Sequence, residues 1–277
     1  MIGRMPELPE VESLRRYLVR EGVVGSVFER VDVEEKPSPD KGTGAIAGTE
    51  LLPGRRVMSL ERRGKQIAAV LDEGVLGLHM GMTGRIDVLA PDEPVSRFTR
   101  VEFHLKNRDS HFRMVLADPR RWGMVQRFES LESIFSGLGP DALDPNLTAE
   151  QFAEAVSRRT SPIKPLLLNQ SLIAGIGNIY ADEALHRVKI SPSRRAKRIS
   201  RKNLIALYCA IRESLEHALE FIQSHPDEQG RPYIVDALDD RARLVRRPGS
   251  FCPRCEIPLR TLKFGGRTAY FCRNCQR

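Results

Sequence analysis

The residues with the clearest chemistry stand near the start of the chain, in the segment MPELPEVE from Met5 to Glu12. If synthesis starts at Met5 and that methionine is removed, Pro6 becomes the first residue and carries a free secondary amine. An α-amino group has a reference pKa of roughly 7.7–8.0, so part of it is unprotonated and nucleophilic near neutral pH. Such an amine can attack a sugar C1′ and form an iminium, with the Glu7 carboxylate beside it to move protons. The segment also fits an ordinary helix start, because proline and acidic residues favour the first helical turn.

Four cysteines at the other end of the chain have the spacing of a metal site. Cys252, Cys255, Cys272 and Cys275 form the pattern C-x2-C-x16-C-x2-C, which lies within the zinc-ribbon range. In a reducing cytosol, metal binding is favoured over two disulfides. Four thiolates suit a closed tetrahedral structural site, so we predict one zinc ion. The fifth cysteine, Cys209, falls in a helical apolar run and is predicted to be packed in the core.

The composition indicates a globular protein with a polyanionic partner. The chain has 277 residues, of which 41% are hydrophobic, and a formal net charge of +8 with a pI near 9.5. This length allows two domains, and the basic balance favours nucleic acid over an acidic membrane surface. No apolar run approaches the roughly 20 residues of a membrane span, and nothing resembles a signal peptide. We therefore expect a cytoplasmic protein.

The first half of the chain is predicted to be a helix followed by a β-rich domain. A helix is expected over Glu10–Arg20, because apolar residues recur on one face before two glycines. Beyond it the apolar period changes to two. The expected strands are Gln66–Leu71, Val75–His79, Arg85–Leu89, Thr99–Leu105, Phe112–Ala117 and Met124–Phe128. Many short strands separated by turns favour a β-sandwich or flattened barrel, with the first helix packed on its edge.

The second half is predicted to be helical up to the cysteines. Residues 131–146 contain several glycines and prolines and are expected to form a linker between domains at 5–130, 147–247 and 248–277. Thr148 and Gln151 form a capping box before a helix that runs to about Arg158. Further helices are expected over Pro162–Asn169, over Asn178–Arg187, and from Ser200 along an apolar stripe. Eight Lys or Arg residues between positions 187 and 202 fit phosphate contact, although such runs often mark a solvated face.

Several motifs, taken together and in this order, resemble those of the formamidopyrimidine-DNA glycosylase family. Besides MPELPEVE they are RRGK at 62–65, HMGMTG at 79–84, DPRRWG at 118–123, NQSLIAGIGNIYADEAL at 169–185 and GGRTAYFCRNCQR at 265–277. The resemblance covers residues 5–277. It implies an α+β multidomain fold: an N-terminal β-sandwich with an N-terminal helix, a helix–two-turn–helix α domain and a C-terminal zinc ribbon. It also implies a monomer that binds damaged double-stranded DNA across the cleft between domains.

The resemblance implies roles for individual residues in catalysis. Pro6 corresponds to the nucleophile that forms a Schiff base with the damaged nucleotide, and Glu7 to its proton-handling partner. Lys65 resembles the lysine that donates a proton in β-elimination. Arg267 resembles the finger arginine that is associated with δ-elimination and phosphate binding. These types fit the chemistry, because cutting a backbone on both sides of a sugar needs a nucleophile, proton shuttles and cationic clamps.

The resemblance also implies DNA contacts. Met82, Arg120 and Trp122 correspond to three residues that fill the gap left when the damaged base leaves the stack. The family usually has Phe where this chain has Trp122, so an altered opposite-base preference is expected. Further DNA contacts are expected at His79, Arg159, Lys164 and Asn178. Asn178 stands at a predicted helix N-terminus, which is a natural anion site.

The activity implied is the removal of oxidised purines, such as 8-oxoguanine and formamidopyrimidines, followed by strand cleavage through β,δ-elimination. Two departures from the family pattern bear on this expectation. The segment Glu220–Val235 lacks the Gly/Ser/Thr-rich composition of the loop that covers the flipped base, and Phe98 replaces a DNA-contacting His of many relatives. Oxidised-pyrimidine specificity, as in the sister branch of endonuclease VIII, therefore stays open. A non-catalytic damaged-DNA-binding protein is a third reading if Met1–Arg4 is retained.

Overall fold

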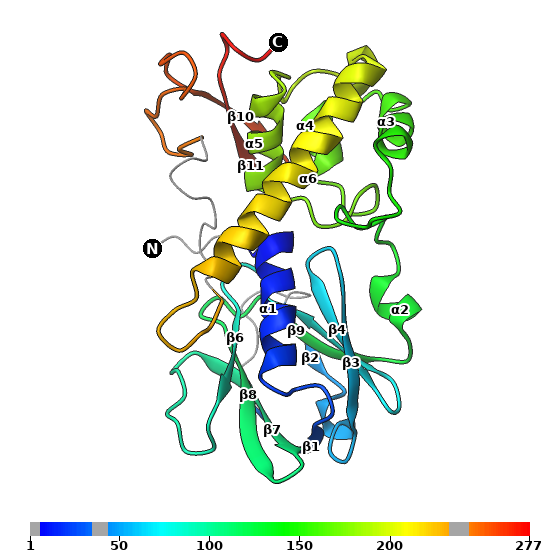
Figure 1. Cartoon of the computed structure of the whole chain (residues 1–277), viewed down its shortest axis with the longest axis vertical. Helices are drawn as coiled ribbons and strands as arrows, with labels where there is room; N and C mark the ends of the chain where they lie inside the picture. The colour runs from blue at the N-terminus through cyan, green and yellow to red at the C-terminus, as the bar shows by residue number, and fades with distance from the viewer. Residues whose placement is uncertain (1–5, 35–43, 233–243) are drawn as a thin grey trace. The chain divides into compact units, whose positions relative to one another are not determined.

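The computed structural model of the chain describes residues 6–34, 44–232 and 244–277, which form two compact units. The first unit contains the described residues up to Ser136 together with 222–232, and the second contains 137–221 and 244–277. Figure 1 shows both units with their helices and strands. The domain boundaries expected from the sequence stay a prediction.

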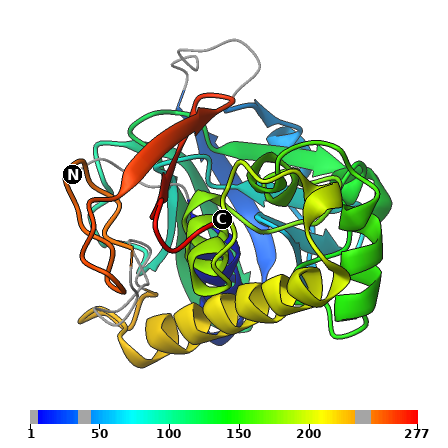
Figure 2. The same cartoon turned by 90° about the horizontal axis from the view of Figure 1, so that it is seen from above.

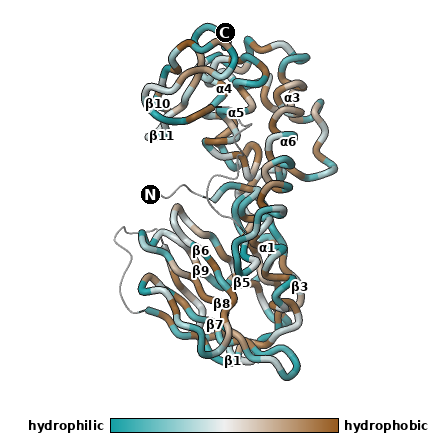
Figure 3. Tube along the Cα trace, turned by 60° about the vertical axis from the view of Figure 1, so that its left-hand side comes forward, coloured by the Kyte–Doolittle hydropathy of each residue, from teal (hydrophilic) through white to brown (hydrophobic). Residues whose placement is uncertain are grey.

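The first unit is a sandwich of two sheets. One sheet has the strand order β1 (Val27–Val33), β7 (Thr99–Asn107), β8 (Ser110–Ala117) and β6 (Arg85–Leu89). The other has the order β2 (Ile46–Ala47), β9 (Met124–Phe128), β5 (Val75–His79), β4 (Gln66–Leu71) and β3 (Val57–Arg63). All pairings are antiparallel except that of β2 with β9. Buried hydrophobic residues alternate with more polar ones along β7 (Figure 3), as expected for a strand with one buried face, whereas β4 and β5 are buried along most of their length.

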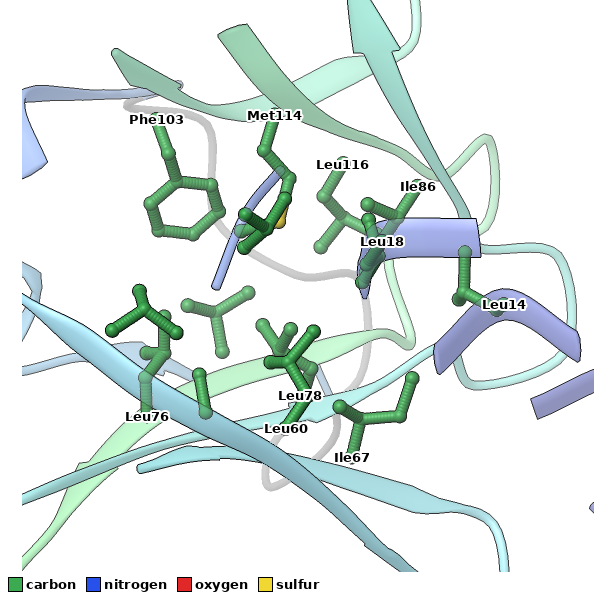
Figure 4. Close-up of a cluster of buried hydrophobic side chains, with 14 of the residues drawn as sticks. Leu14, Leu18, Leu60, Ile67, Leu76, Leu78, Ile86, Phe103, Met114 and Leu116 are labelled. Atoms are coloured by element: carbon green, nitrogen blue, oxygen red, sulfur yellow. The ribbon is translucent and has the colours of Figure 1, made fainter. Parts of the chain in front are cut away.

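The core of this unit is shared by the two sheets and helix α1 (Leu8–Arg20). Leu14 and Leu18 lie one turn apart on the same face of α1 and are almost fully buried. Their side chains meet Ile67 from one sheet and Ile86 from the other (Figure 4). Burying a leucine side chain of this kind contributes about 1.5–3 kcal/mol. The helix that carries the start of the chain packs against β3, an edge strand of one sheet, and through Tyr17 against β6, an edge strand of the other, as the expected packing on the edge of the sandwich requires.

The six strands expected from the sequence are all present, and two of them, β7 and β8, extend further than predicted. Strands β1 and β3 were not individually predicted, because their patterns VFERVDV and VMSLERR carry several charged residues. The short helix η1 (Thr49–Leu51) and helix α2 (Leu131–Phe135) complete the unit. Helix α2 lies at the start of the expected linker, where Ser130 accepts a capping hydrogen bond from the Ser133 N–H.

The second unit is helical with a β-hairpin at its end. Its elements are α3 (Ala149–Ser157), α4 (Ile163–Leu167), α5 (Asn178–Arg187), η2 (Ala196–Arg198), most of α6 (Arg201–Ser224), β10 (Arg260–Phe264) and β11 (Arg267–Phe271). The expected capping box before α3 is present: the Thr148 N–H donates to Gln151 Oε1 at 2.8 Å, and the Gln151 N–H donates to Thr148 Oγ1 at 3.2 Å. The predicted fold class is confirmed.

The prediction that Cys209 packs in the core is wrong. The apolar stripe of α6, which includes Leu204, Leu207, Ile211 and Leu215, is buried as expected. Cys209 is exposed. It lies two residues from both Leu207 and Ile211, and a helix turns by about 200° over two residues, so its side chain points away from the stripe.

The hairpin of β10 and β11 lies beside α5 in Figures 1 and 2. Gly265 and Gly266 form its two-residue turn with φ angles of +52° and +77°. Glycine suits this turn, because both central residues of such a hairpin need positive φ. Arg267 follows directly and is exposed. Among the described residues, no helix combines the length and the apolar character that a membrane crossing requires.

Candidate active site and DNA-binding residues

Pro6 and Glu7 stand at the very start of α1. Glu7 is the N-cap residue, is only 3% exposed, and its N–H donates to the Glu10 carboxylate at 2.9 Å in a capping box. Pro6 precedes it and is buried. The capping box fixes the direction in which the chain enters the helix. The helix N-terminus also favours negative charge at Glu7. The fold thus fixes the positions of these two residues relative to the sandwich.

Glu12 ties the same helix to the RRGK turn. Its carboxylate accepts hydrogen bonds from Arg15 at 2.7 Å, Arg16 at 2.8 Å and Arg62 at 3.0 Å. Burial alone would raise the pKa of Glu12, but the hydrogen bonds from Arg15 and Arg16 and the charge of Arg62 lower it to about 2. Arg62 belongs to β3 and stands three residues before Lys65. Its hydrogen bond to Glu12 therefore ties α1 to β3 close to this lysine.

Lys65 and His79 lie at the same end of the second sheet. Lys65 is in the two-residue turn between β3 and β4, and His79 is the last residue of β5, which pairs with β4. Lys65 is only 8% exposed. Burial, assisted by the charge of Lys65, lowers the pKa of His79 to about 4, so the imidazole is neutral at physiological pH. Its Nδ1 accepts from the Gly81 N–H at 3.1 Å, which places the ring proton on Nε2 as a donor.

Met82, Arg120 and Trp122 form one cluster at the surface of the first unit. The Arg120 guanidinium lies 3.8 Å from the centre of the Trp122 ring, and its Nη1 lies 3.5 Å from Met82 Sδ. Arg120 is exposed, whereas Met82 and Trp122 are half-buried. The structure therefore brings together the three residues that the sequence assigned to gap filling. They come from two separate loops, one after β5 and one after β8.

Asp118 organises both loops, and sequence analysis did not single it out. Its carboxylate accepts from the N–H groups of Trp122 at 2.7 Å, Gly123 at 2.6 Å and Arg120 at 3.1 Å, and from the Thr83 hydroxyl. The side chain is 1% exposed. A buried carboxylate with several donors gains strong charge-assisted hydrogen bonds. The signal in the sequence was Asp-Pro at the head of a loop, which is typical of a turn whose aspartate bonds to following N–H groups.

Gly81 allows the two loops to approach each other closely. It has φ of +59°, and a Cβ at this position would lie 2.6 Å from the Trp122 carbonyl carbon. A side chain at this position would force the backbone of Trp122 and Gly123 to shift. The glycine in HMGMTG thus serves the same cluster as Asp118.

In the second unit, a buried charge network joins α4, α5 and the hairpin. Asp182 is 1% exposed and accepts from the Lys164 ammonium, from Arg246 Nε at 3.0 Å and from the Tyr270 N–H at 3.1 Å. Arg246 Nη2 donates to the Thr268 carbonyl at 3.1 Å. Tyr270 and Thr268 belong to β11, so the network holds the strand that begins at Arg267.

Asn178 is the first residue of α5, and its side chain also bonds to the hairpin. Its Nδ2 donates to the Thr268 carbonyl at 3.1 Å. Arg267 is the neighbour of Thr268, so the structure brings Asn178 and Arg267 to adjacent positions. Both were assigned to phosphate contact, and the N-terminus of α5 offers backbone N–H groups suited to an anion.

Of the two remaining DNA-contact candidates, Arg159 is exposed and Lys164 is not. The Lys164 side chain is 0% exposed and forms an ion pair with Asp182. The expectation that Lys164 contacts DNA is therefore corrected: in this structure its ammonium cannot reach a phosphate. The lysine stands 18 residues from its partner in sequence, so the pairing was not visible there.

The four cysteines of the ribbon converge on one point. Their sulfurs lie within 4.8 Å of one another, with Cys252–Cys275 at 3.9 Å and Cys255–Cys272 at 3.4 Å. Tetrahedral zinc with Zn–S bonds of about 2.3 Å needs sulfurs roughly 3.8 Å apart, so the arrangement fits a zinc ion and all four cysteines are free. His186 Nε2 lies 3.3 Å from the Cys252 sulfur, a contact of the kind that orients metal ligands.

A zinc finger fixed to a helical unit, and a surface cluster of exposed Arg120 and half-buried Trp122 on a basic chain, are features of a nucleic-acid-binding protein. Three family models match it. The formamidopyrimidine-DNA glycosylase N-terminal domain matches residues 5–125, the H2TH domain of the same glycosylase matches 138–227, and the zinc finger found in FPG and IleRS matches 249–277.

Similar proteins extend along the whole chain. The formamidopyrimidine-DNA glycosylase of Pelotomaculum thermopropionicum is 35% identical over 284 residues, covering 99% of both chains. That of Thermus thermophilus is 36% identical over 283 residues, covering 98% of both. A solved structure of MutM in complex with DNA containing carbocyclic 8-oxo-G has a TM-score of 0.83 and 26% identity, covering 98% of this chain and 100% of that one. The chain belongs to the formamidopyrimidine-DNA glycosylase family, and is a DNA glycosylase with a structural zinc site.

Proposed function

We propose that this protein removes oxidised purines from duplex DNA through a Schiff base at Pro6 and then cuts the strand by β,δ-elimination. The substrate class is supported by the full-length relatives and by neighbours solved with 8-oxo-G and FAPY-dG DNA. The observation that carries the mechanism is the capping box at Glu7, which fixes the residue after Pro6 at the start of a buried helix. We further propose that it acts as a monomer in the bacterial cytoplasm, since its relatives are bacterial.

The first step is displacement of the damaged base. The Pro6 nitrogen, when it is the chain terminus and unprotonated, attacks C1′ of the nucleotide. The bond from C1′ to the base breaks, and the base leaves with the bonding electrons and takes up a proton. The amine gives up its proton, the C1′–O4′ bond breaks as O4′ takes up a proton, and the opened sugar is held as an iminium between Pro6 and C1′. Glu7 lies directly beside the nucleophile and serves as the group that moves protons during this step.

Strand cleavage follows from the iminium, which acidifies the proton on C2′. A base takes up that proton as the C3′–O bond to the 3′ phosphate breaks. In the second elimination a proton leaves C4′ as the C5′–O bond to the 5′ phosphate breaks. Lys65 is the proposed proton donor in the first of these steps, and Arg267 is the proposed phosphate partner in the second. The neutral His79 beside Lys65 presents its Nε2–H as a further donor to phosphate, because its depressed pKa of about 4 prevents a second positive charge there. Zinc would be held by the four cysteines and would keep the hairpin folded without entering the reaction.

The Met82–Arg120–Trp122 cluster is the proposed wedge. Extruding a base from duplex DNA costs a few kcal/mol, and inserted side chains offset that cost. Stacking on Arg120 holds the Trp122 ring, and Asp118 holds the backbone of both residues. The larger indole covers more of a base than a phenyl ring does, so discrimination between opposite bases is the property that should differ from relatives with Phe.

The proposal is tested by excision assays on defined duplexes. Release of 8-oxoguanine opposite C is compared with release of thymine glycol under single-turnover conditions. Faster purine release supports the proposal, and faster thymine-glycol release supports the oxidised-pyrimidine alternative. Binding to damaged duplex without release of either base would instead establish a non-catalytic binding protein. In the same assays Pro6→Gly should slow base release, and Pro94→Gly, at an exposed loop position, is the matched control that should not.

A further inference from the structure

An exposed basic surface surrounds the turn that leads into α6. We call it the η2 basic surface, and its members are Arg159, Arg194, Arg195, Lys197, Arg198, Arg201 and Lys202. All seven side chains are exposed. None of them belongs to the wedge, to the Pro6 site or to the charge network of Asp182.

The backbone brings these residues together from two parts of the sequence. Helix η2 packs beside α3, and the Lys197 N–H donates to the Arg159 carbonyl at 3.1 Å. Arg195 forms an isolated β-bridge with Pro162. Arg201 begins α6 only three residues after η2 ends. The chain enters this region from the C-terminal end of α5, whereas Asn178 is at the N-terminal end of that helix, about 15 Å away for its 10 residues.

The charges of this surface are not neutralised by the protein. Among the residues that the structure describes, none of the seven has an ion pair with a carboxylate. Basic residues that flank the surface behave differently, since Arg158 pairs with Glu154, and Arg187 pairs with Glu183. An uncompensated group of like charges opposes folding, so its presence indicates a binding partner rather than a structural role.

The position of two members strengthens this argument. Arg201 and Lys202 lie in the first turn of α6, which contains no acidic residue. The positive end of the helix dipole disfavours cations at this place, where Asp or Glu is the usual choice. Their placement opposes helix stability, and it would be offset by a bound anion.

The residue types of the η2 basic surface favour a phosphate backbone over a membrane as the polyanion that it binds. The two apolar residues inside the segment, Ala196 and Ile199, are buried, so no apolar side chain within 194–202 is available to enter a bilayer. Peripheral membrane binding by such a segment normally needs an apolar face beside the basic one. A phosphate backbone needs only closely spaced exposed cations, because duplex DNA carries about one charge per 1.7 Å of its axis.

We infer that the η2 basic surface binds the backbone of duplex DNA, as a contact additional to the lesion site. The inference rests on the proposed function only in taking duplex DNA as the polyanion. It explains why six further cations gather beside Arg159, the one member already expected to contact DNA, although the glycosylase chemistry does not use them. Such contacts carry no sequence information. They increase the affinity for undamaged DNA, on which the protein searches for lesions.

The test compares two triple variants that each remove three exposed positive charges. Arg195→Gln, Lys197→Gln and Arg198→Gln change the η2 basic surface. Arg56→Gln, Lys106→Gln and Arg108→Gln are the matched control, at exposed positions of the first unit that have no ion pair among the described residues. The affinity of each zinc-loaded protein for undamaged duplex is measured from about 50 to 200 mM salt. One duplex has about one helical turn, and the other about four.

Each phosphate contact adds about 0.9 to the slope of log K against log salt, so the first variant should have a slope lower by about 2.7 on the longer duplex. When the salt concentration rises fourfold, the affinity of the first variant should therefore fall by a factor about 40 times smaller than that of the unmodified protein. The control should keep the original slope. Equal slopes for the two variants overturn the inference. It is also overturned if the first variant keeps the original slope on DNA and loses only its binding to anionic vesicles. The single reversal Lys197→Glu replaces the triple variant if the latter does not fold.

Because this assay uses undamaged DNA, it does not depend on excision. If the unmodified protein does not release a damaged base, the proposed function is refuted and the binding result is unaffected. Unchanged salt dependence in the first variant, with normal excision, would refute only the role of the η2 basic surface.

Discussion

Replacing Asp182 with Asn should destabilise the second unit strongly. The substitution keeps the shape of the side chain and an oxygen for the Tyr270 N–H, but removes the charge. Lys164 would then be a fully buried ammonium without its carboxylate, since both side chains are at most 1% exposed. Removing one partner of a buried ion pair costs about 3–5 kcal/mol, because the remaining charge stays desolvated.

The size of this effect should depend on Lys164. In the double variant Asp182→Asn with Lys164→Met, the fully buried ammonium is gone. Arg246 remains, but it is 10% exposed and still donates to the Thr268 carbonyl, so much of the lost stability should return. The coupling free energy from the double-mutant cycle should exceed about 2 kcal/mol. The exposed pair of Arg158 and Glu154, with side chains 74% and 64% exposed, is the control. Arg158→Ala should cost no more than about 0.5 kcal/mol, because exposed ion pairs are screened by solvent.

The assay is denaturant unfolding with separate probes for the two units. Trp122 is the single tryptophan and reports the first unit by fluorescence. Release of zinc from the cysteines reports the finger. Asp182→Asn should move the zinc-release transition to lower denaturant and leave the Trp122 transition in place. If the single substitution costs no more than Arg158→Ala, or if Lys164→Met fails to restore stability, the account of the buried network is wrong.

Three further predictions concern other parts of the chain. Asp118→Ala should slow single-turnover excision by about 10–100-fold, because each charge-assisted hydrogen bond to the wedge backbone contributes about 1.5–3 kcal/mol; an unchanged rate would contradict its positioning role. Glu12→Gln should destabilise the first unit at neutral pH. Because the folded pKa of Glu12 is depressed to about 2, the difference from the unmodified protein should persist above pH 4.5, shrink as the pH falls toward 2 and be measurable by denaturant titration; a pH-independent difference would exclude the ion network as its cause. Removing zinc with a strong chelator should unfold the hairpin that carries Arg267, since structural zinc contributes apparent energies of about 10–16 kcal/mol; a finger that stays folded by NMR without zinc would count against the metal site.

Local signals in the sequence predicted local structure well. The Thr148 capping box, the period-two strands and the cysteine spacing each depend on residues close in sequence, and each is present in the structure. Cys209 was placed in the core because its surroundings are apolar, but a helix has two faces and the phase of the stripe decides exposure. A single apolar run therefore predicts a helix more securely than it predicts the burial of one member.

Features made by distant residues could not be predicted in the same way. Lysine is normally exposed, and Lys164 is buried only because Asp182, on another helix, supplies a carboxylate. The dependence of Arg120 and Trp122 on Asp118 needs the loop to be folded before the hydrogen bonds exist. The resemblance to a family supplied the list of candidate residues, and the structure supplied the contacts that hold them.

The most direct test of the proposed mechanism is to map the covalent complex formed on damaged duplex in the presence of borohydride. Reduction converts the iminium into a stable bond, and mass spectrometry of the digested complex identifies the attached residue. The account predicts attachment at the nitrogen of Pro6, as the first residue of the reacting chain. Attachment at Lys65 or any other amine, or full-rate cleavage by protein whose Pro6 nitrogen is part of a peptide bond, would contradict it.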